Sequence, residues 1–361
     1  MVDKRNKIID FLRGIVILDM MAVHYSKYFN IIPNINISKL IGYTDFAIEG
    51  FIILSGFMVG NYYFEKFKKD KKAVIRRLLN RTFEIIKIQY LMILTISLPL
   101  AITMGNMVTQ SDTTISYIIK SLLFLNQVPL LHILPTFIPL FLIAIPILYL
   151  LEKDMDFLVL LISITFFIIG NFYPYLFNIS DIRDKTIFPV ILWQIYFVIG
   201  VILGKKSYLR GNELPTKILP HFILSIVIFS ILSFWYFGHH IYPYLGGIKD
   251  MHNITVKKFP LNILGLFYHG SILYIIFCII ILLWRYINGY NALFRTLTLL
   301  GRYSLLAFVI HVYFFRILDF INYNMDMSRQ IHLLLIAMNI IIILVILKYF
   351  ARKKALCIDG S

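Results

Sequence analysis

Long apolar runs alternate with short polar and basic segments along the whole chain, and this pattern predicts an all-α polytopic membrane protein. About 20 apolar residues cross the hydrocarbon core of a bilayer as a helix, and the runs have roughly that length. We therefore expect about ten transmembrane helices in a single membrane domain, residues 1–361. The predicted spans are 8–28, 44–63, 82–104, 134–151, 156–178, 188–204, 217–238, 262–285, 297–316 and 329–349.

Two apolar segments carry additional information. The stretch 114–131 is interrupted by polar residues, so we interpret it as an interfacial or re-entrant helix. In the second span, Ser55 and Gly56 are small residues that allow a neighbouring helix to approach closely.

Composition supports the membrane interpretation, since 59% of the 361 residues are hydrophobic and only 15% are charged. A soluble domain is roughly half apolar and about a quarter charged. The formal net charge of +16 does not indicate nucleic-acid binding, because the basic clusters flank apolar spans. Cys278 lies inside a predicted span and Cys357 in the terminal tail, so no disulfide framework is expected.

Lysine and arginine are unevenly distributed between the two sets of predicted loops. If the N-terminus is cytoplasmic, the inner segments hold more than twice as many of these residues as the outer ones. Cytoplasmic loops of membrane proteins carry such an excess. We therefore expect a multi-pass protein of the plasma or inner membrane with both termini cytoplasmic and the loop 239–258 outside.

The first predicted span contains two ionisable residues, Arg13 and His24, that are costly to place in hydrocarbon. They are eleven positions apart, which returns to nearly the same helix face after a rise of about 16 Å. One face of this helix is thus expected to present a fixed cation near its cytoplasmic end and an imidazole near its outer end.

A carboxylate is expected at the depth of His24. With span 2 running inward, Glu49 lies about 7 Å below the outer face, and His24 lies about 24 Å above the cytoplasmic face of a core about 30 Å thick. A carboxylate beside an imidazole holds its tautomer and stabilises its protonated form. We interpret His24 as a general base and Glu49 as its orienting carboxylate. Asp45, nearer the helix end, is the alternative carboxylate.

Two further arginines lie at the head of the third span. Arg77 and Arg81 are four residues apart and so share one helical face. Guanidinium groups match phosphate oxygens with a planar fork. With Arg13 they are expected to form a cationic mouth on the cytoplasmic side that fits a phosphorylated ligand.

Other chemistry is less evident in the sequence. We interpret His269 and His311 as histidines that pack inside the helix bundle. The chain has no zinc-ligand spacing, Gly-rich phosphate loop or nucleophile elbow, so we expect no metal and no permanently bound cofactor.

These motifs resemble the acyltransferase 3 superfamily of membrane acyltransferases. Its first-helix signature is an arginine, ten residues and a histidine, as in Arg13 and His24. The stretch 49–57 resembles its second-helix motif, and Arg77 with Arg81 its arginine pair before helix three. The nearest branch is OpgC-like, whose members are succinyltransferases of periplasmic glucans. The segments 133–141, 193–200 and 300–308 are similar to that branch.

The resemblance implies an enzyme that moves an acyl group, succinyl or acetyl, from cytoplasmic acyl-CoA to a hydroxyl of an extracytoplasmic polysaccharide or oligosaccharide. Acyl-CoA is then a co-substrate, its phosphates held by Arg13, Arg77 and Arg81, and the lipid bilayer is the surrounding partner. Two alternatives have no acyl chemistry. A secondary transporter predicts two related halves, which the sequence does not show. A glycan flippase would not need Arg13, His24 or Glu49 individually.

Overall fold

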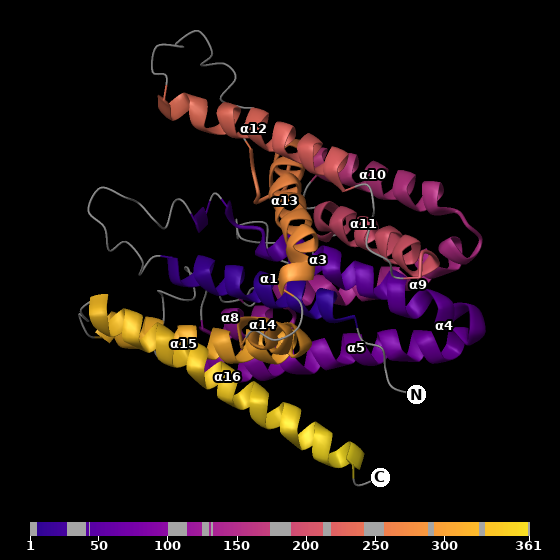
Figure 1. Cartoon of the computed structure of the whole chain (residues 1–361). Coiled ribbons are helices and arrows are strands. Elements are labelled where there is room, and N and C mark those ends of the chain that lie inside the picture. Colours follow the sequence, from indigo (N-terminus) through magenta and orange to yellow (C-terminus); the bar gives the residue numbers. More distant parts are fainter. Residues whose placement is uncertain are drawn as a thin grey trace. The chain divides into compact units, whose positions relative to one another are not determined.

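Every regular element in the described part of the chain is a helix, which confirms the all-α prediction (Figure 1). The computed structural model describes residues 6–26, 41–42, 44–99, 114–124, 130, 133–173, 189–211, 218–241, 256–287, 292–324 and 329–359. The ends of several predicted spans, most of the stretch 125–131 and most of the loop 239–258 lie outside these residues.

The chain divides into two compact units, Met1–Phe51 with Ile272–Ser361, and Ile52–Ser271. We call them unit 1 and unit 2 and describe each by itself. Helices α3 (Ala47–Met58) and α13 (Ile263–Ile287) contribute residues to both. The prediction of a single domain stays a prediction.

Several helices fit a membrane protein. Within the described residues, five are long and apolar enough to cross a bilayer, and one bent pair would make a sixth. The five are Ala47–Lys69, Ile133–Glu152, Val190–Leu209, Ile263–Trp284 and Gln330–Lys353. The other predicted spans fall on helices that are shorter, such as α10 (Asp156–Phe172), or carry more charge, such as α1 (Lys7–Tyr25). The count of ten spans therefore stays a prediction.

Unit 1 is built around the contact between α1 and α14 (Ala292–Arg302). A Cβ atom on Gly14 would overlap the backbone of Leu297, and one on Gly301 would overlap the backbone of Asp10. The two glycines therefore let the helices approach closely. Phe11 of α1 stacks on Phe294 of α14, with ring centroids 5.4 Å apart. Helices α15 (Ser304–Asn324) and α16 (Arg329–Asp359) complete the unit.

The predicted span 297–316 is not one straight helix. Helices α14 and α15 meet at Tyr303 with a bend of 89°. Hydropathy reports how apolar a segment is and carries no information about its direction, so the bend was not anticipated. The bend turns α15, which carries His311, away from the axis of α14.

Unit 2 packs around α11 (Val190–Leu209), whose close neighbour is the end of α3 with its π-helical continuation η2 (Val59–Tyr63). Four glycines make this contact possible: Gly56 faces the backbone of Phe197, and Gly60 that of Val201. In return, Gly200 and Gly204 face the backbones of Ile53 and Phe57. The close approach expected from Gly56 is confirmed.

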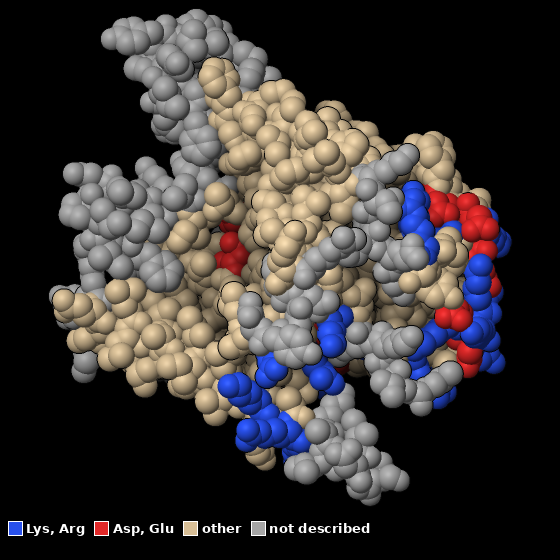
Figure 2. All heavy atoms as spheres, in the orientation of Figure 1, with Lys and Arg blue, Asp and Glu red and all other residues tan. Residues whose placement is uncertain are grey.

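The remaining elements of unit 2 are also helical. In its described residues, the predicted interfacial segment contains the short helix α8. The bounds are α4 (Phe64–Lys69), α5 (Lys71–Met92), η3 (Ile93–Ser97), α8 (Thr114–Leu122), α9 (Ile133–Glu152) and α12 (Leu219–Ile241). On the face in Figure 2, basic and acidic side chains gather at the right-hand edge, where Figure 1 shows α4 and the start of α5.

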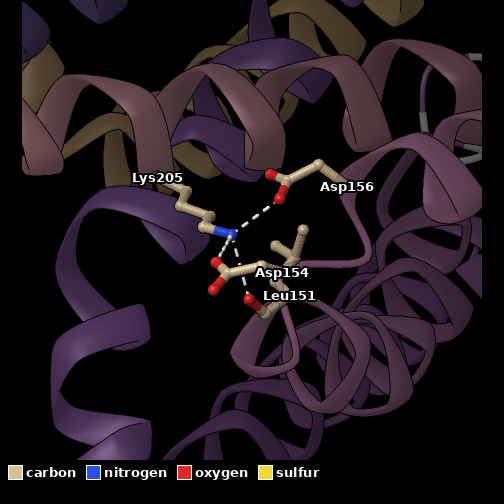
Figure 3. A network of polar contacts seen from close by, with 4 residues as sticks. All are labelled: Leu151, Asp154, Asp156 and Lys205. Carbon is tan, nitrogen blue, oxygen red and sulfur yellow. Dashed lines mark hydrogen bonds and ion pairs between the residues drawn. The ribbon is translucent and has the colours of Figure 1, made fainter.

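A buried cation joins the end of α11 to the turn between α9 and α10 (Figure 3). The Lys205 ammonium donates to Asp156 at 2.7 Å, to Asp154 at 2.9 Å and to the carbonyl of Leu151 at 3.0 Å. Its side chain is 3% exposed, against 28% for Asp156 and 79% for Asp154. The hydrogen bond from Lys205 lowers the pKa of Asp154 below its ordinary value. The contact with Leu151 gives a hydrogen-bond donor to a backbone carbonyl at the C-terminal end of α9, where cations are favoured.

Candidate active site

Two histidines from distant parts of the sequence form a direct pair in unit 1. His24 lies in the last turn of α1 and His311 in the first half of α15. The Nδ1 atom of His24 lies 2.7 Å from Nε2 of His311, within hydrogen-bond distance. Their rings are nearly parallel, with centroids 5.0 Å apart and an interplanar angle of 10°.

Two aromatic side chains pack against this pair. Tyr25 meets the His311 ring edge-on at 5.1 Å between centroids, and Phe315 lies 6.0 Å from the His24 ring. His311 is fully buried, whereas His24 is only partly buried. Of the two rings, only His24 therefore has exposed surface.

The beginning of α3 carries the candidate carboxylates. Asp45 accepts a hydrogen bond from the Ala47 amide at 3.0 Å and so caps α3. The same segment is held to α1, because the Phe46 amide donates to Asp19 at 2.9 Å. Glu49, in the first turn of α3, is fully buried.

Charges from two elements act on His24. Asp45, ahead of α3, and Arg316, on α15, both interact with its ring electrostatically. A carboxylate near the imidazole stabilises its protonated form and an arginine opposes it. Asp45 is thus a carboxylate that the structure brings to His24, while the pairing of Glu49 with His24 stays a prediction.

The three arginines of the predicted cationic mouth fall in different units. Arg13 lies on α1 in unit 1 and is half-buried. Arg77 and Arg81 lie on α5 in unit 2, where Arg77 is exposed. Arg81 forms an ion pair with Glu84 at 2.5 Å, an interaction absent from the sequence interpretation. A common site for all three arginines stays a prediction.

Metal ligands do not gather in the part of the chain that the structure describes. No group of three or more His, Cys, Asp or Glu side chains is placed there to hold an ion.

Comparison with known proteins identifies the family. The family model described as OpgC protein matches residues 5–355, nearly the whole chain. The chain belongs to the OpgC family. Searches of curated proteins and of solved structures found no match. OpgC proteins are a family of glucan succinyltransferases, and membership implies a transferase that acts on glucans.

The pair gives this OpgC-family chain a site that its sequence predicts only in part. The sequence indicates a reactive His24, whereas it indicates a packing role for His311. The two lie 287 positions apart, and no periodic pattern links them. The sequence does contain one signal for His311, because an ionisable side chain inside an apolar helix costs enough free energy to indicate a function.

Proposed function

We propose that this protein is an integral-membrane O-acyltransferase. It moves an acyl group, succinyl or acetyl, from cytoplasmic acyl-CoA to a hydroxyl of an extracytoplasmic glycan. The observation that supports this most directly is the His24–His311 pair near Asp45, in a chain whose family consists of glucan succinyltransferases. An imidazole held in one orientation beside a carboxylate is suited to general-base catalysis.

In the proposed reaction, His24 removes the proton from the glycan hydroxyl. The hydroxyl oxygen attacks the thioester carbonyl, an ester bond forms, and the bond between the acyl carbon and sulfur breaks. Coenzyme A leaves as a thiolate and takes the proton from the His24 imidazolium, so His24 returns neutral. Asp45 stabilises the imidazolium, and Glu49 is proposed to stabilise it as well through its charge.

Arg13, Arg77 and Arg81 are proposed to hold the phosphates of acyl-CoA. Guanidinium groups bind phosphate oxygens through paired, charge-assisted hydrogen bonds. This placement requires the three arginines to face the cytoplasm. About ten spans, which the lengths of the apolar runs predict, with both termini in the cytoplasm, which the distribution of lysine and arginine predicts, meet that requirement. The thioester then reaches the depth of His24 from the inner side and the glycan enters from the outer side.

Proteoliposomes test the proposal. The purified protein is reconstituted, and succinyl-CoA or acetyl-CoA with a labelled acyl group is added on one side of the membrane. A β-glucan oligosaccharide is supplied on the other side. We expect label to appear on the glucan as an alkali-labile ester. A protein that transfers no label from either donor but moves an intact ion or glycan across the bilayer would contradict the acyltransferase proposal and favour a transporter or flippase.

A further inference from the structure

His311 has no direct route to a substrate, because its side chain is fully buried in unit 1. Its Nε2 atom faces Nδ1 of His24 at 2.7 Å. This contact occupies one nitrogen of His24 and leaves Nε2 as the nitrogen that can meet an acceptor hydroxyl. The protonation of that nitrogen therefore depends on the direction of the hydrogen bond between the rings.

Two neutral imidazoles can share this bond in only two ways, because one of the facing nitrogens must carry the proton. If His311 donates from Nε2, the free Nε2 of His24 is protonated and cannot accept a proton. If His24 donates from Nδ1, its free Nε2 has a lone pair and is a base. The second arrangement also suits the imidazolium, whose Nδ1–H continues to donate to His311.

The side chain of Asn339, from α16, lies beside the His311 ring. It is fully buried, and within the described residues neither its amide atoms nor Nδ1 of His311 has a hydrogen bond of good geometry. An amide oxygen is a hydrogen-bond acceptor, so Asn339 can serve as the partner of a protonated Nδ1 of His311. If Oδ1 of Asn339 accepts the proton on Nδ1 of His311, then His311 is left with a lone pair on Nε2.

We infer that His311 and Asn339 are positioning residues that hold His24 in its base tautomer, an inference that rests on the proposed function. Asn339 accepts from His311, and His311 accepts from Nδ1–H of His24. This chain of two hydrogen bonds orients a neutral ring without adding a charge. Burial of an imidazole and an amide costs free energy that an apolar pair would avoid, so packing alone does not account for them.

The tautomer can be measured directly by NMR on wild-type protein with ¹⁵N-labelled histidine in nanodiscs. Protonated and unprotonated ring nitrogens resonate in separate regions, and His24 is assigned from its absence in His24→Ala. We expect Nδ1 of His24 to be protonated and Nε2 to be unprotonated. A protonated Nε2 would overturn the inference, and this test needs no substrate.

Substitutions test the same chain through acyl transfer from labelled succinyl-CoA or acetyl-CoA. His311→Phe keeps an aromatic ring but no acceptor. We expect kcat to fall by about tenfold or more, while the affinity for acyl-CoA is unchanged. The upper limit is about 10⁴-fold, the loss seen when the histidine of a catalytic triad is left in the wrong tautomer. His311→Gln places an amide oxygen near the position of Nε2 and should restore much of the loss. Similarly, Asn339→Asp should transfer faster than Asn339→Leu.

His332→Phe is the matched control, because His332 is also a buried histidine but lies on α16. It should transfer at the wild-type rate. If His24→Ala is inactive but His311→Phe transfers normally, or if His311→Gln is as slow as His311→Phe, the positioning role is wrong and the proposed function stands. If His24→Ala itself transfers normally, the proposed function fails and the positioning role fails with it.

Discussion

At the scale of single residues, the structure favours Asp45, the alternative carboxylate, as a charge that acts on His24. Asp45 both caps α3 and interacts with His24. Asp45→Asn keeps an oxygen for the cap and removes only the charge. Since the imidazole becomes positive during proton abstraction, we expect kcat to fall by about tenfold, equivalent to ~1.4 kcal/mol.

Glu49→Gln is the companion variant, because it leaves the buried shape of Glu49 and removes its charge. We expect it to slow transfer less than His24→Ala does, since the base remains. Initial rates with labelled acyl-CoA at saturating concentration measure both variants. Transfer by Asp45→Asn at the wild-type rate would exclude an electrostatic role for Asp45.

The arginines of α5 give a prediction about affinity. Loss of a charge-assisted phosphate contact costs about 1.5–3 kcal/mol, so Arg77→Ala or Arg81→Ala should weaken acyl-CoA binding about tenfold or more. Lysine at either position should rescue only partly, because an ammonium cannot form the paired contact. Glu84→Gln should instead tighten binding by releasing Arg81 from its ion pair.

Calorimetry with acyl-CoA in nanodiscs measures these affinities, and Arg76→Ala is the matched control on the same helix. An unchanged Kd in both Arg77→Ala and Arg81→Ala would refute the docking role.

At the scale of helices, the Lys205 network predicts an order of stabilities (Figure 3). Asp156 is largely shielded from solvent and Asp154 is mostly exposed, while both bind the same buried ammonium. Asp156→Asn keeps an oxygen acceptor but leaves the buried ammonium without this carboxylate charge, so it should destabilise the protein by about 1–3 kcal/mol. Asp154→Asn should have a smaller effect, because solvent replaces an exposed partner.

Thermal unfolding in detergent measures this order. The exposed pair between Lys69 and Glu65 supplies the control, since Lys69→Met should leave the midpoint nearly unchanged. Equal shifts for Asp154→Asn, Asp156→Asn and Lys69→Met would show that the buried network does not stabilise unit 2.

The positions of helices and one contact between helices could be predicted from the sequence. Which helices lie next to one another could not. Apolar run length indicated where helices occur, and the small side chain of Gly56 indicated a close approach. The bend at Tyr303 and the pairing of His311 with His24 depend on which helices become neighbours. Hydropathy averages over a segment and carries no information on neighbours, so these features required the structure.

At the scale of the whole molecule, the proposed reaction requires one orientation in the membrane. We expect reporters fused after Lys69 and at the C-terminus to be cytoplasmic and one within 239–258 to be outside, because basic residues concentrate in the predicted inner segments. Alkaline phosphatase and fluorescent-protein fusions measure the two sides. A reporter after Lys69 found outside would invert the orientation and remove the route for acyl-CoA.

The central claim, that His24 is the base for acyl transfer, is tested most directly by single-turnover transfer from labelled acyl-CoA to glucan by wild type and His24→Ala. We predict that His24→Ala inserts into membranes and binds acyl-CoA as the wild type does but transfers about 10²–10⁴-fold more slowly, the usual cost of losing a general base. Transfer by His24→Ala at near the wild-type rate would contradict the account.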